Sequence, residues 1–131
     1  MKSLKIDRLR SLVISISREY DSALKFLHDA LKISEEIGDN FKVTACLANI
    51  GNTYLNMNDP RALEYYERAL EKVGDNNLSL LVNIRVNMGI IYTRLDKYDQ
   101  ALTHFNEALP IAEKIKLRHP IGEIWAKIGL V

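Results

Sequence analysis

The sequence is poor in cysteine and proline, has no long apolar stretch and carries no excess of charge. Its 131 residues include one cysteine, Cys46, which cannot form an intramolecular disulfide, so a reducing cytoplasmic location is expected. No apolar run approaches the roughly 18 residues of a membrane span, and no signal-peptide pattern is present. Lys and Arg (18) nearly balance Asp and Glu (17). We therefore expect neither a membrane nor a nucleic-acid partner, since nucleic acid usually requires a concentrated basic surface.

One short pattern recurs three times along the chain. Alanines at Ala23, Ala62 and Ala101 lie 39 residues apart, and each begins the pattern Ala-Leu-x-x-(Leu/Tyr/Phe)-x-x-Ala-Leu. The apolar residues within the pattern are three and four positions apart, which places them on one face of an α-helix. Such a period predicts a stack of similar helical units.

A second pattern precedes two of these segments and returns near the end of the chain. Ile50-Gly51-x-x-Tyr54 matches Met88-Gly89-x-x-Tyr92, and Ile128-Gly129 repeats its first half. Glycine inside a helix costs about 1 kcal/mol relative to alanine. Its recurrence at one place therefore predicts a close helix crossing, where a side chain would collide with the neighbouring helix. No alternating pattern of the strand type competes with this interpretation.

The two patterns together predict an all-α fold, an α-solenoid of about three helical hairpins and one trailing helix. We expect helices near residues 4–17, 20–37, 41–57, 60–73, 78–95, 98–116 and 119–131. They form a single domain, 1–131, with hairpins at 4–37, 41–73 and 78–116. The trailing helix, 119–131, either caps the last hairpin or belongs to a longer array. Its apolar residues would also allow two copies to form a homodimer.

These residues resemble the tetratricopeptide repeat family, whose pattern reads W-x-x-L-G-x-x-Y, then A-x-x-x-F, then A and P. Trp125-x-x-Ile128-Gly129 matches the opening, and Gly89-x-x-Tyr92 with Ala101-x-x-x-Phe105 matches the middle. The spacing of 38 to 40 residues exceeds the family's usual 34, so the chain is similar to the extended variety of the repeat. The first repeat departs from the pattern, with Arg10-Ser11-x-x-Ile14 in place of the glycine and tyrosine.

The resemblance implies that the first helix of each hairpin lines a concave groove, where a protein or peptide ligand lies. Asparagine offers a donor and an acceptor to a peptide backbone without a charge to desolvate. We therefore expect the groove to contain four asparagines, an apolar floor and a basic rim. The asparagines are Asn49, Asn52, Asn83 and Asn87; the floor is Val86 and Ile90; the rim is Arg8, Arg94 and Lys127. The alternative, that the asparagines are polar residues tolerated beside a tight helix crossing, stays open.

Nothing in the sequence predicts an enzyme, a metal site or a cofactor. His28, His104 and His119 lie on three different expected helices, and the acidic residues alternate with basic ones at helical spacing, as on solvated helix faces. The function predicted is a non-catalytic interaction module that binds a peptide or helix of a partner protein. The alternative is a regulatory segment of a larger signalling or transcription-regulating protein, as part of a longer array.

Overall fold

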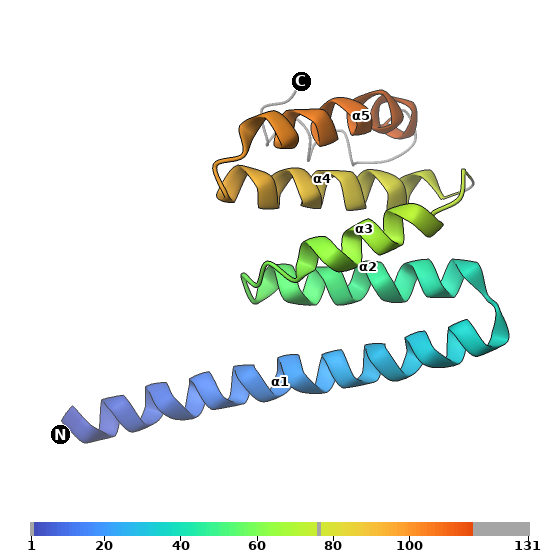
Figure 1. Ribbon diagram of the computed structural model, residues 1–131. Helices are drawn as coiled ribbons and strands as arrows, with labels where there is room; N and C mark the ends of the chain where they lie inside the picture. Colours follow the sequence, from blue (N-terminus) through green and yellow to red (C-terminus); the bar gives the residue numbers. More distant parts are fainter. Residues whose placement is uncertain (1, 76, 117–131) are drawn as a thin grey trace.

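The computed structural model describes residues 2–75 and 77–116, and all regular structure in them is α-helical. The five helices are α1 (Lys2–Ile37), α2 (Asn40–Asn56), α3 (Ala62–Lys72), α4 (Leu78–Arg94) and α5 (Tyr98–Lys116). Figure 1 shows them stacked in chain order, with α2–α3 and α4–α5 as antiparallel hairpins. α1 packs on α2, and both α2 and α3 contact α4. The prediction of an all-α solenoid is confirmed.

Each hairpin is closed by a glycine on its first helix and an aromatic ring on its second. A Cβ atom built on Gly51 would lie 2.8 Å from Cε1 of Tyr66, and one built on Gly89 would lie 2.5 Å from Cε1 of Phe105. Both distances are shorter than a real contact permits. The recurring glycines therefore let α2 approach the ring on α3, and α4 the ring on α5, as the sequence predicted.

The buried side chains form two clusters. The larger lies among the C-terminal half of α1, α2, α3 and α4, and is centred on Leu47, Ile50 and Tyr66, all fully buried. The smaller joins α4 to α5 through Val82, Val86, Ala101, Phe105, Ala108 and Ala112. Burying a large apolar side chain contributes about 1.5–3 kcal/mol, so these clusters are the main source of stability.

The turns inside the two hairpins share one feature. Asn58, four residues after Tyr54, has φ 57°, and Asp96, four residues after Tyr92, has φ 60°. In each turn the next amide donates to the tyrosine carbonyl at 2.9 Å, from Asp59 in the first and from Lys97 in the second. Asparagine and aspartate tolerate this left-handed conformation better than most other residues. The residue type at this position therefore decides how easily the chain can reverse.

The first repeat is not a hairpin. Separate helices at 4–17 and 20–37 were expected, but Lys2–Ile37 is one continuous helix. By the repeat spacing, Arg18 occupies the position of Asp96, and arginine adopts the left-handed conformation poorly. Arg8 occupies the position of Val86, which is only 9% exposed, so folding the helix back would bury a guanidinium. Both differences from the third repeat therefore favour a straight helix over a hairpin.

The N-terminal half of α1 consequently extends beyond the end of α2 (Figure 1). Residues 4–19 are all exposed. α1 ends at Ile37 and is followed by Gly38, whose φ is 79°. The Asp39 carboxylate then caps α2 by accepting from the amide of Lys42 at 3.1 Å. The expected trailing helix, 119–131, lies outside the described residues. Among the helices that are described, none has a segment long and apolar enough to cross a membrane.

Candidate ligand-binding surface

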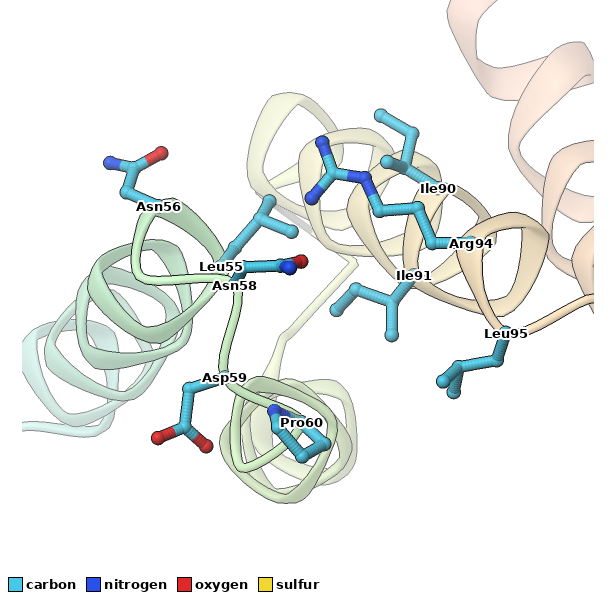
Figure 2. A pocket seen from close by; sticks show the side chains of 9 residues that line it. All are labelled: Leu55, Asn56, Asn58, Asp59, Pro60, Ile90, Ile91, Arg94 and Leu95. Atoms are coloured by element: carbon cyan, nitrogen blue, oxygen red, sulfur yellow. The ribbon is translucent and has the colours of Figure 1, made fainter.

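An open cavity of about 760 Å³ lies where the C-terminal ends of α2 and α4 meet. Figure 2 shows side chains from both helices, and from the turn after α2, facing this space. The apolar part of the lining is Leu55, Pro60, Ile90, Ile91 and Leu95. The polar part is Asn56, Asn58, Asp59 and Arg94. The cavity therefore combines an apolar floor with amides and both signs of charge.

The acidic member of this set is already paired. The carboxylate of Asp59 accepts a hydrogen bond from the backbone amide of Arg61 at 2.9 Å and lies 2.7 Å from Nη2 of the same residue. These hydrogen bonds lower the pKa of Asp59, with burial acting weakly in the opposite direction. The guanidinium of Arg61 also lies 4.6 Å from the centre of the Tyr54 ring. Asp59 is thus held ionised and its charge is largely balanced within the turn.

The basic member, Arg94, has no such partner among residues 2–75 and 77–116. It stands exposed in the last turn of α4, and no carboxylate of that part of the chain forms an ion pair with it. In Figure 2 its guanidinium extends from α4 toward the α2 side of the cavity, beside Ile90. A guanidinium binds a carboxylate by two parallel hydrogen bonds. The cavity is therefore suited to an apolar group with a carboxylate beside it.

The structure brings some of the predicted groove residues together and separates others. Ile90, predicted for the floor, and Arg94, predicted for the rim, both line this cavity. Arg8 is exposed on the projecting half of α1. Lys127 lies outside the described residues. Val86 is 9% exposed and packs against α5, so little of its side chain is available to a ligand.

The four asparagines divide into two pairs. Asn49 and Asn83 are exposed, and their side chains make no hydrogen bond within the described ranges. Asn52 and Asn87 are half-buried and bonded to one another: Nδ2 of Asn87 donates to Oδ1 of Asn52 at 3.1 Å. The hydroxyl of Tyr66 donates to the same oxygen at 2.5 Å. The side-chain oxygen of Asn52 is therefore occupied by contacts between helices and not free for a ligand.

A second polar cluster joins α4 to α5. Nη2 of Arg85 lies 2.7 Å from Oε2 of Glu107, and Nη1 lies 3.1 Å from Nδ1 of His104. The His104 ring stacks on Tyr92 with centroids 5.4 Å apart. Burial, and then the charge of Arg85, lower the pKa of His104, while Glu107 and Glu67 act in the opposite direction. The guanidinium of Arg85 is thus bound to α5 within the hairpin.

Sequence reasoning missed Leu55, Asn56, Asn58 and Leu95 as part of the lining. The signal was present in Asp59-Pro60, which stands where the other two repeats have a tyrosine. In the structure the linker between α2 and α3 is residues 57–61, and three of its side chains, those of Asn58, Asp59 and Pro60, line the cavity. No cluster of three or more histidine, cysteine or acidic side chains suited to a metal ion occurs in the described part of the chain.

Comparison with known proteins agrees with this architecture. The tetratricopeptide repeat family matches residues 45–114, more than half of the chain. The chain is also similar to the human intraflagellar transport protein 88 homolog, with 24% identity over 132 aligned residues. That alignment covers 98% of this chain but only 16% of the human protein. No solved structure matches significantly.

Proposed function

The chain belongs to the tetratricopeptide repeat family, whose repeats mediate protein–protein interaction, and from this premise we propose that α2 and α4 bind a segment of a partner protein. The observation that carries the proposal is the cavity between the ends of these helices, lined by both Ile90 and Arg94. The module is non-catalytic, and its ligand is a peptide or a helix.

The lining defines the chemistry of that ligand. Ile90, Ile91 and Leu55 accept an apolar side chain, and its burial supplies most of the affinity. Arg94 binds an acidic side chain or a terminal carboxylate next to it, since Asp59 is already neutralised by Arg61. Asn49 and Asn83, exposed on the same two helices, pair with the peptide backbone. Binding weakens as salt is added because part of it is electrostatic.

Selection from a library of displayed random peptides tests the proposal. Peptides enriched on the wild-type chain alone are then measured for binding to Ile90→Glu and Arg94→Glu, and Lys114→Glu on the exposed side of α5 serves as the charge-matched control. The enriched peptides share an apolar residue beside an aspartate, a glutamate or the C-terminus, and bind the Lys114 variant as well as the wild type. Enriched peptides that bind all four chains equally would place the ligand elsewhere.

A second role, as a regulatory segment within a larger protein, is favoured by the human relative, since the chain corresponds to 16% of its length. An output domain encoded next to this segment in the full-length gene would distinguish the two roles. Both use the same surface, because a regulatory segment must also recognise a partner.

A further inference from the structure

α1 carries a seam in which most positions are large, exposed apolar side chains. The positions are alternately three and four residues apart, which is the spacing of a coiled-coil seam. Their large members and exposed fractions are Leu9 61%, Leu12 57%, Ile16 42%, Phe26 72%, Ile33 56% and Ile37 70%. The remaining positions are Glu19, Ala23 and Ala30. Leu4, Ile6, Val13 and Ile14 are exposed on other sides of the N-terminal half of α1, but the seam alone continues at this spacing from Leu9 to Ile37. An exposed apolar line of this length is a candidate docking surface.

This seam is not the face with which α1 packs on its own domain. Leu24, Leu27 and Leu31 face the larger core cluster, and Leu31 is 5% exposed. The seam lies beside this packed face, on a side of α1 that stays uncovered in the described residues. The helix therefore has one face for the repeats and another for a separate partner.

We propose that the seam binds α1 of a second copy of this chain, running antiparallel. In that arrangement large residues meet small or complementary ones in successive layers about a two-fold axis near residue 21. Leu9 packs on the second copy's Ile33, Leu12 on its Ala30, and Ile16 on its Phe26. Glu19 opposes Ala23 near the axis, where the carboxylate reaches solvent past the small methyl group. Each layer occurs twice by symmetry.

The charges of α1 fix the direction of the second helix. Residues 2–18 contain five basic residues and one acidic residue, whereas residues 19–37 contain two basic and five acidic residues. A parallel pair would place like charges together along the whole seam. An antiparallel pair places each basic half against an acidic half, with Arg8 next to the second copy's Glu36 at the edge of the seam. Opposite charges at such flanking positions set the orientation of paired helices.

The occupant also has to be long enough. The seam extends from Leu9 to Ile37, so a helix covering it needs the length of α1 itself and the reverse order of charge. A second α1 supplies both. The dimer leaves the cavity between α2 and α4 free. The dimer and ligand binding can therefore be tested independently of one another.

The first test is the mass of the complete chain in sedimentation equilibrium. We expect a reversible dimer with twice the 15.0 kDa mass of the chain. Phe26→Glu should raise the dimer dissociation constant by at least about 100-fold, because it buries two carboxylates in apolar layers. Ile14→Glu is the matched control, since Ile14 is 51% exposed on the opposite side of the helix. Unchanged helical content by circular dichroism confirms that both variants fold.

The second test reads the direction of the pair. Two chains are prepared in a Cys46→Ala background, one with Ile16→Cys and one with Phe26→Cys. After mixing and mild oxidation, we expect a disulfide between the two kinds of chain. Phe26→Cys alone should not cross-link, because its counterpart in the second copy lies 10 residues, about 15 Å, along the axis.

Three results would overturn the proposal. They are a strictly monomeric chain at every concentration, a dimer that Ile14→Glu dissociates and Phe26→Glu does not, and efficient cross-linking of Phe26→Cys with itself. A monomeric disulfide in the double variant Ile16→Cys/Phe26→Cys would show instead that α1 folds back on itself.

Discussion

Asn87 on α4 donates a hydrogen bond from Nδ2 to Oδ1 of Asn52 on α2, at 3.1 Å, and so ties together two helices of successive repeats. The same oxygen accepts from the hydroxyl of Tyr66 on α3 at 2.5 Å. Two donors use both lone pairs of that oxygen. Tyr66 is fully buried, and burial raises the pKa of its hydroxyl, which therefore remains a protonated donor. One amide thus holds three helices in register.

Removing this amide should destabilise the domain without changing its fold. Asn52→Ala leaves the Tyr66 hydroxyl and one N–H of Asn87 without an acceptor in a half-buried place, at a cost of about 1–3 kcal/mol. Asn49→Ala, on the exposed side of the same helix, should change stability by less than about 0.5 kcal/mol. Urea unfolding followed by circular dichroism gives both values. Equal effects of the two substitutions would mean that the bond contributes nothing.

Gly89 should tolerate alanine less well than Gly51, although alanine is the better helix former by about 1 kcal/mol. The new methyl would lie 2.5 Å from the Phe105 ring at position 89 and 2.8 Å from the Tyr66 ring at position 51. Overpacking of this kind typically costs about 1–3 kcal/mol. Gly74→Ala is the control, because nothing lies within 4 Å of its added Cβ. Combining Gly89→Ala with Phe105→Leu should recover part of the loss in the same thermal-unfolding assay.

The repeat patterns predicted the fold because they record contacts between helices that are adjacent in sequence. Gly51 and Gly89 each meet a ring within the same hairpin, so a single chain reveals both members of the contact. The straight α1 was not predicted, because its cause is two unfavourable positions, Arg8 and Arg18, within a segment that otherwise follows the helical pattern. Apolar periodicity therefore locates helical residues well. Whether the chain turns between two helical segments depends on a few individual residues, which periodicity does not report.

The candidate site was predicted only in part, for a related reason. Ile90 and Arg94, which line the cavity, were placed on the groove by the family resemblance together with helical spacing. Asn87 and Asn52 were also on the correct helices, but hydrogen bonds between residues 35 positions apart leave no mark on a local pattern. Leu55 and Asn58 were missed because they line the cavity only through the packing of the end of α2 against α4, which a local pattern does not record.

Acidification should weaken the domain through His104. Its Nδ1 lies 3.1 Å from the guanidinium of Arg85, which is always protonated, so Nδ1 must accept and the ring is neutral. The pKa is lowered in the folded state, so below the ordinary value of 6.5 the unfolded chain binds a proton that the folded chain does not. This contribution to stability is complete above that pH and is lost as the pH falls below it.

His104→Phe, which keeps a ring against Tyr92, should therefore show a smaller loss of stability between pH 7.5 and pH 5.5 than the wild type. The measurement is the urea midpoint at each pH. His28→Phe is the control, since the ring of His28 meets Tyr65 edge-on, with centroids 5.7 Å apart, and makes no hydrogen bond to an arginine in the described part of the chain. An identical pH dependence of stability in wild type and His104→Phe would show that protonation of His104 does not destabilise the domain.

The left-handed turn residues give a prediction that connects the two hairpins with the straight α1. Asn58 and Asp96 adopt φ angles of 57° and 60° at equivalent points of the two turns. Replacing either by glycine should leave stability unchanged or raise it slightly, whereas Asn58→Val or Asp96→Val should cost about 1–2 kcal/mol, because a branched side chain crowds the backbone in this conformation. Arg18 occupies the same point in α1, so the order should reverse there: Arg18→Gly lowers helical content and Arg18→Ala preserves it. Circular dichroism and thermal unfolding of these variants measure both trends. If glycine were harmful at 58 and 96 and harmless at 18, turn residues would not be what separates the hairpins from the continuous helix.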